Sequence, residues 1–390
     1  MRQYAAQQLR AAGEEADVCA RHAAYIRELT ARAEPDLITA GQPEWLHRLD
    51  AEQGNLRAAL AWSLAGGDRA CGVEIAGTVM WYWFLRGQLL EGRHWLEPAV
   101  VLGRQLGASH ALTKILEALG LFIGFEGDLD RARELLQEGE TVGRLAGPAA
   151  ELDMVLCRRY IGFIAMFKGD LVEARAIFDE LLAYHRRTAP DRPERTARRL
   201  ASMLVSNSEL AYAEGNLDAA LASASEALPL MRSSGDLHGL AAALDKLARI
   251  ALLHGQFDSA FAYWQEAVAC SRELYIPMNL IESAEGIGAV YAVRGEPDRA
   301  ALLFGAVAAL RRRIGIARRV IYVGLYDDIM AETAAALGQE EYDRLFQLGQ
   351  GMTVEEALDA TAEPYLPAGD ISRAAASGGA AAREGEAAAG

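Results

Sequence analysis

The sequence predicts an all-α protein, a solenoid of helical hairpins that forms a right-handed superhelix. One observation behind this prediction is a recurring phrase: a Gly, usually a polar residue, usually Leu or Phe, two variable positions and an Ala. The other is its spacing, since successive turn glycines are 40, 42, 46, 40 and 40 residues apart. Regular spacing of this length is typical of arrays in which each unit buries its apolar face against its neighbours.

Each copy of the phrase is expected to join two helices. Gly adopts the left-handed conformation that ends a helix, the polar residue after it helps to start the next helix, and a small residue five positions on allows close contact. The turn glycines are Gly127, Gly169, Gly215, Gly255 and Gly295, with Gly87 in a degenerate sixth copy.

Two further positions recur around each turn. Seven residues before the Gly the chain places a small residue in most copies, namely Gly120, Gly162, Ser208, Ala248 and Gly288. Nine residues after the Gly it places mostly large apolar residues, namely Leu96, Leu136, Phe178, Ala224, Trp264 and Phe304. We therefore expect about six hairpins over residues 72–312, each packing a large side chain on its neighbour.

The flanks complete the expected domain organisation. Helices are predicted over 14–33 and 43–65 in an N-terminal cap (1–71), and over 320–337 and 353–361 in C-terminal capping helices (313–366). A capping-box pattern starts the last of these at Thr353. Residues 188–193 form a proline-containing insert between hairpins, and residues 367–390, rich in Ala and Gly, are expected to be a disordered tail.

The spacing of small residue, turn and Ala resembles the tetratricopeptide repeat, stretched from about 34 to about 40 residues. The runs WLHRLDAEQGNLRAALAWSL (45–64), WYWFLRGQLLEGRHWLEPAV (81–100), LLFGAVAALRRRIG (302–315) and GMTVEEALDA (351–360) resemble the repeat region of large ATP-binding LuxR-type bacterial transcriptional regulators and their signal-transduction ATPase relatives. The resemblance covers about residues 1–361 and implies a regulatory role in the bacterial cytoplasm.

Two parts of that family have no counterpart in this sequence. No G-x-x-x-x-G-K-[ST] loop is present to cradle phosphates, and the final helix is followed by the Ala/Gly stretch instead of a helix-turn-helix. Residues 1–9 resemble the end of the family's winged helix. A truncated gene, a late start and a stand-alone descendant all remain open, and so does access to DNA through another chain.

Composition excludes several function classes. The formal net charge of −15 argues against direct binding of nucleic acid or an anionic membrane. The most apolar run, residues 75–85, is too short to span a bilayer and is expected to be one buried helix. The four cysteines have no metal-ligand spacing, which fits a reducing cytosol, and no catalytic motif occurs. We expect no enzyme activity, no metal and no cofactor.

The concave wall, formed by the first helix of each hairpin, is the predicted functional surface. Mixed charges and aromatic rings there suit a peptide or a partner helix. Counting back from each turn Gly gives the candidate residues Trp81, Phe84, Lys114, Glu117, Arg159, Phe163, Glu209, Tyr212, Asp245, Arg249, Glu282 and Glu285. Pairs one turn apart, such as Asp245 with Arg249, could instead be ordinary surface ion pairs.

Two functions remain open at this stage. The first is a non-enzymatic scaffold or sensor that binds a protein partner or peptide in the groove. The alternative is a sensor of a small-molecule inducer, which requires a pinched apolar pocket near Trp81, Phe84 and Phe163. Two basic stretches, 185–199 and 311–319, are expected to be solvated or to serve as partner contacts. Self-association stays open.

Overall fold

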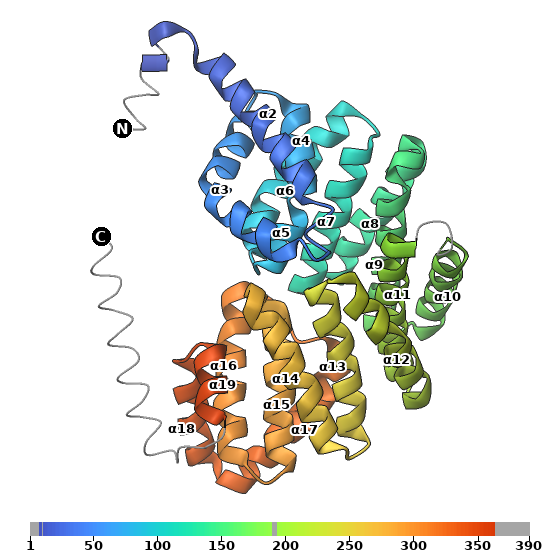
Figure 1. The fold of residues 1–390 in the computed structure, drawn as a ribbon, viewed down its shortest axis with the longest axis vertical. Helices are drawn as coiled ribbons and strands as arrows, with labels where there is room; N and C mark the ends of the chain where they lie inside the picture. Colours follow the sequence, from blue (N-terminus) through green and yellow to red (C-terminus); the bar gives the residue numbers. More distant parts are fainter. Residues whose placement is uncertain (1–7, 10, 189–192, 363–390) are drawn as a thin grey trace.

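In a computed structural model, residues 8–9, 11–188 and 193–362 are described, and all regular structure within these ranges is helical. The expected tail (367–390) and most of the proline insert (189–192) lie outside the described residues. The expectation of an all-α helical-hairpin solenoid is confirmed. Figure 1 shows the early helix pairs above the late pairs, with α9 to α12 joining the two groups at one side.

The helices of the central region alternate as first and second members of pairs. The first members are α4 (Arg69–Thr78) with α5 (Met80–Leu85), α7 (His110–Glu126), α9 (Glu151–Phe167), α11 (Pro193–Ala213), α13 (Leu237–Leu253) and α15 (Pro277–Val293). The second members are α6 (Leu89–Leu106), α8 (Leu129–Ala146), α10 (Leu171–Thr188), α12 (Leu217–Ser234), α14 (Phe257–Leu274) and α16 (Pro297–Ile314). A short 3₁₀ turn, η1 (Pro148–Ala150), precedes α9.

The predicted turns adopt the backbone conformation that only Gly takes readily. All six turn glycines have positive φ, from 64° at Gly87 to 100° at Gly127. Asp128, Asp170 and Asn216 then cap the following helix, each side chain accepting a hydrogen bond from a backbone N–H three residues on. The sequence phrase therefore encodes a helix stop followed at once by a helix start.

The small and large positions that flank each turn contact one another. A Cβ added to Gly162 would lie 2.4 Å from Cε1 of Phe178, and one added to Gly288 would lie 2.8 Å from Cε1 of Phe304. Phe178 and Phe304 are fully buried. The absence of a side chain at the glycine is what admits the ring, so the two helices of a pair approach closely.

The residues 75–85 do not form one helix. Helix α4 ends at Thr78 and α5 begins at Met80, with Val79 between them at φ −95° and ψ 0°. Tyr82 and Trp83 are fully buried, and the hydroxyl of Tyr82 donates to Asp50 at 3.0 Å. The break lets successive aromatic rings of this run reach both the core and the concave side.

Among the described residues, helices with assigned bounds flank the pairs on both sides. Helices α2 (Glu15–Ala33) and α3 (Gln42–Leu64) precede them, and α17 (Val320–Leu337), α18 (Gln339–Gln350) and α19 (Val354–Thr361) follow. The capping box at Thr353 is present, since its hydroxyl accepts from the N–H of Glu356 while the Glu356 carboxylate accepts from the N–H of Thr353. Helix α17 folds back against α13 and α15, and α18 crosses α16.

The two ends of the array meet, which makes the superhelix a closed ring. The guanidinium of Arg86, at the end of α5, donates to the carbonyl of Leu274 at the end of α14. The N–H of Ala317 donates to the carbonyl of Phe125 at 3.3 Å. Gly235 packs against Ala40, since a Cβ added to it would lie 2.7 Å from the Ala40 Cβ. We call this set of contacts the seam.

The crossing of α16 and α18 gives a test of this packing. A Cβ at Gly349 would lie 2.0 Å from the carbonyl oxygen of Leu302, so Gly349→Ala must push the two helices apart. We expect it to lower the free energy of unfolding by about 1–3 kcal/mol. Gly54→Ala is the control, because no atom lies within 4 Å of an added Cβ in the middle of α3. It should raise that free energy by about 0.5–1 kcal/mol. Urea titration measures the free energy of unfolding of both variants. If Gly349→Ala is more stable than Gly54→Ala, the packing described here is wrong.

Candidate functional site

A cavity of about 1070 Å³ lies inside the ring. Its wall is built by the inner faces of α5, α7, α9, α11, α13 and α15, together with the α2–α3 connection and residues 317–320. The first helices of successive pairs supply most of this wall because the second helices lie outside them. The cavity is therefore the concave side of the repeats, narrowed by the segment before α17.

The structure brings nine of the twelve candidate residues together on the cavity wall. These are Trp81, Phe84, Lys114, Glu117, Arg159, Phe163, Glu209, Asp245 and Glu282. Tyr212, Arg249 and Glu285 do not line it. Tyr212 packs edge-on against Tyr322 of α17 with ring centroids 5.1 Å apart, so α17 covers the part of the wall where they were expected.

One cluster of aromatic rings lies around Phe84, at the end of the wall formed by α5 and α7. The ring of Phe84 contacts those of Phe125 and His238, with centroids 5.5 and 5.4 Å apart, and Trp81 lies edge-on to Phe84 at 5.4 Å. Burial lowers the pKa of His238, which keeps its imidazole neutral. Its Nδ1 has no hydrogen-bond partner among the described residues. The cluster therefore gives this end of the cavity a mainly aromatic surface.

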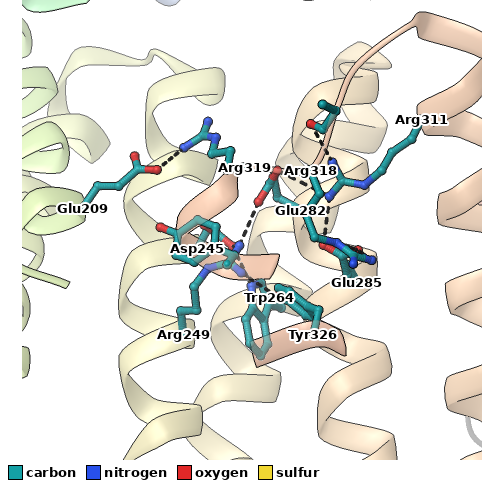
Figure 2. Close-up of polar contacts among 12 residues, drawn as sticks. Glu209, Asp245, Arg249, Trp264, Glu282, Glu285, Arg311, Arg318, Arg319 and Tyr326 are labelled. Carbon is teal, nitrogen blue, oxygen red and sulfur yellow. Dashed lines mark hydrogen bonds and ion pairs between the residues drawn. The ribbon is translucent and has the colours of Figure 1, made fainter. Parts of the chain in front are cut away.

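The charges at the late end form a buried network, shown in Figure 2. Asp245 accepts hydrogen bonds from Arg249 at 2.8 Å and from the indole N–H of Trp264 at 3.0 Å. Arg249 also donates to Glu282 at 2.8 Å and to the hydroxyl of Tyr326 at 2.6 Å. Arg249 is only 1% exposed. The alternative interpretation of Asp245 and Arg249 as an ordinary surface ion pair is thus wrong. Both side chains are buried, and Tyr326 of α17 contacts Arg249.

Three arginines of the second basic stretch point inward, whereas Arg312 and Arg313 are exposed. Arg318 and Arg311 both donate to Glu285, at 2.8 Å each, and Arg319 donates to Glu209 at 2.6 Å. Glu209 and Glu285 are almost fully buried. The expectation that residues 311–319 are solvated or contact a partner is therefore wrong for these three arginines. Arg318 and Arg319 hold the start of α17 in the ring by pairing with the buried carboxylates of Glu285 and Glu209.

Burial and ion pairing act in opposite directions on these carboxylates. Burial alone would raise the pKa of Asp245, but Arg249 and Lys246 outweigh it, and the pKa lies well below its ordinary value. The same balance lowers the pKa of Glu209, where Arg319 and Lys246 oppose burial. Both carboxylates are therefore ionised in the folded chain and lend stability only while they stay so.

Glu117 of α7 is the exception on this wall. Its side chain is 1% exposed and its Oε1 has no hydrogen-bond partner among the described residues. Burial, followed by the nearby charge of Asp153, raises its pKa well above the ordinary value of 4.5. Glu34 adds to this effect, while Lys114 and Arg159 oppose it. Unlike Glu209 and Asp245, Glu117 therefore has no cation within ion-pair distance among the described residues.

Arg159 of α9 is the matching cation. Its Nε donates to the hydroxyl of Ser206 at 2.9 Å and its Nη1 to that of Ser202 at 2.7 Å. No carboxylate of the described residues lies within ion-pair distance of it, and its guanidinium sits 5.5 Å from the ring centre of Phe163. Two neutral hydroxyls orient the guanidinium and leave its charge available.

Several residues that line the cavity are not among the candidates predicted from the sequence. Phe125 continues the face of α7 that carries Glu117, eight residues further on, so helical spacing alone could have found it. Ser202 is found only by the hydrogen bond it receives from Arg159. The segment 317–320 belongs to no repeat, and no pattern in the sequence indicates that it enters the ring.

Metal sites and membrane-spanning helices are both absent from the ranges that the structure covers. No group of three or more His, Cys, Asp or Glu side chains is placed to hold a metal ion there. None of the helices in those ranges is long and apolar enough to cross a membrane.

Comparison with protein families and solved structures agrees with this geometry. The tetratricopeptide repeat model matches residues 199–273, which span most of α11 and all of α12 and α13 and reach into α14. The fold is that of a tetratricopeptide-type solenoid. A Rap protein complexed with competence and sporulation factor is similar at TM-score 0.54 and 11% identity, covering 93% of this chain and 99% of that one.

Two further similarities concern regulatory proteins. A signal transduction ATPase with numerous domains from Pyrococcus horikoshii, which carries a tetratricopeptide repeat sensor, matches at TM-score 0.52 and 14% identity, over 82% of this chain and 46% of that one. Proteins named as HTH-type transcriptional regulators from Mycobacterium tuberculosis and Mycobacterium bovis are 22% identical over 92% of this chain. The chain spans 57% of their length.

The buried network predicts a large effect of a small change. Asp245→Asn removes the charge that Arg249 and Lys246 face in the interior, so we expect the free energy of unfolding to fall by about 3–5 kcal/mol. Asp179→Asn breaks a surface pair with Arg175 on α10 and should cost less than about 1 kcal/mol. Chemical denaturation measures the free energy of unfolding of both variants and of the wild type. Equal losses would contradict the interior role of Asp245.

Glu117 predicts a pH-dependent stability. In the unfolded chain the Glu117 carboxyl loses its proton near its ordinary pKa. In the folded chain it keeps the proton to higher pH. Glu117 therefore destabilises the wild type increasingly as the pH rises above 4.5. Glu117→Gln should melt at a higher temperature than wild type, by a margin that widens as the pH rises above 4.5. Glu28→Gln, at an exposed position on α2, should show no widening margin. A constant difference between Glu117→Gln and wild type would refute this.

Proposed function

We propose that this chain is the ligand-sensing repeat module of a bacterial transcriptional regulator, which acts in the cytoplasm and binds a short peptide in its cavity. The observation that carries the proposal is the cavity itself. Its volume of about 1070 Å³ slightly exceeds the usual range for ligand pockets, about 300–1000 Å³. It joins an aromatic end to a charged wall, a combination that suits a peptide backbone with side chains.

The similarity to regulators supports the regulatory half of the proposal. The mycobacterial relatives are named as transcriptional regulators, and the Pyrococcus protein carries repeats of this kind as its sensor. The Rap protein, alike in fold, was solved with a bound factor. A module of this type reports binding by a change in curvature, which requires that ligand contacts differ between two states of the ring. The proposal assigns the chain no chemical reaction.

The ring favours a short peptide over a partner helix. A helix with its side chains is about 10–12 Å across and needs an open groove. Here the segment 317–320 and α17 occupy the late part of the concave side. The small-molecule alternative rests on the cluster of Trp81, Phe84, Phe125 and His238, which gives the cavity one strongly apolar end.

A binding experiment separates these functions. The purified chain is incubated with a mixed library of synthetic dipeptides to pentapeptides, and the peptides that co-elute with it are identified by mass spectrometry. We expect a small set to be retained. Val155→Trp, which fills space on the cavity wall, should lose this set. Val172→Trp, on an exposed position of α10, should keep it.

The melting curves of both variants establish that they fold. Equal retention by Val155→Trp and wild type would remove the cavity from the mechanism. If no peptide is retained but one metabolite raises the melting temperature in proportion to the logarithm of its concentration, the inducer-sensing function replaces the peptide-binding one.

A further inference from the structure

Most charged groups of the cavity wall are already paired with one another. Lys114 lies 2.6 Å from Glu34, Arg319 lies 2.6 Å from Glu209, and Arg198 lies 2.8 Å from Asp236. His110 lies 2.8 Å from Asp153. In the three pairs made by lysine and arginine, each charge is compensated by its partner, so a ligand gains little by approaching them.

Glu117 and Arg159 differ from these pairs in one respect. Each lies on the wall, each influences the charge of the other, and yet no ion pair joins them. A buried acid without a partner costs folding free energy that a neutral side chain would not. Arg159 is oriented by Ser202 and Ser206, two hydroxyls that can fix a guanidinium without neutralising it. The pair is thus built to meet opposite charges that the protein does not itself supply.

The geometry points to a ligand with two free ends: we propose that Glu117 binds the amino group of a short peptide and Arg159 binds its carboxylate. This assignment deepens the proposed function and rests on it. The two residues sit on α7 and α9, which contact one another as first helices of successive pairs. Packed helices lie about 8–10 Å apart, and an extended chain covers about 3.3–3.6 Å per residue. A peptide of about two or three residues has a length comparable to this spacing of the helix axes.

The surroundings suit the rest of such a ligand. The ring of Phe163 lies beside Arg159, and Phe125 and Phe84 continue along the wall past Glu117. Apolar side chains of a peptide would contact these rings while its ends meet the two charges. An N–H···O⁻ contact to an ammonium and a bidentate contact to a carboxylate are the strongest hydrogen bonds available to either end.

Capped peptides test the assignment. Peptides retained by the wild-type chain are resynthesised in three forms: with both ends free, with the amino end acetylated, and with the carboxyl end amidated. Their dissociation constants are measured by calorimetry. We expect each cap to weaken binding to the wild type by about tenfold or more, since it removes one charge-assisted contact. The retained set should also be dominated by dipeptides and tripeptides.

Two variants assign each end to its residue. Glu117→Gln should abolish the penalty for acetylation and keep the penalty for amidation, and Arg159→Gln should do the reverse. Arg104→Gln, which breaks an exposed pair with Glu138, is the control and should keep both penalties. Melting curves establish that each variant is folded.

The outcomes separate this assignment from the function on which it rests. Peptides that bind equally well with capped and free ends overturn the assignment while leaving peptide sensing intact. Penalties that persist unchanged in the two variants also overturn it, because the ends must then meet other residues. If the wild type retains no peptide at all, the proposed function fails and the assignment falls with it.

Discussion

The close approach of the two helices in each pair is the constraint on which the rest of the structure depends. Where Gly162 admits the ring of Phe178, or Gly288 that of Phe304, a first helix lies directly on its second helix. The first helices of successive pairs lie side by side and line the cavity. The inner faces then form one continuous wall, and the cavity, the charge network and the aromatic end all lie on it.

The repeat architecture could be predicted because it is local. A turn glycine with positive φ, a capping side chain after it and a small residue opposite a large one are each written within a few residues of sequence. Counting from the same turns also placed Trp81, Phe163 and seven other residues on the cavity wall. Within one helix, the spacing of residues from the turn is enough to tell which side chains share the inner face.

The remaining features are non-local, and no pattern in a single sequence expresses them. Arg249 is buried because α17 returns to cover it from 77 residues away. Glu209 is paired because Arg319 enters the ring 110 residues later. The same return decides which carboxylates are compensated and leaves Glu117 without a partner. The return of residues 317–320 and α17 therefore decides whether a charged residue on the inner face is free to bind a ligand or forms a structural ion pair.

The seam changes how the array should fold and unfold. An open solenoid is held together by contacts between neighbours, so its repeats can unravel one after another from either end. Here the contact between Arg86 and Leu274 joins residues 188 positions apart, and that between Ala317 and Phe125 closes a similar loop. Such long-range closure slows folding, because the entropy of the loop is lost before the contact forms. It also ties the terminal repeats to each other, so the ring loses its independent ends and unfolds as a unit.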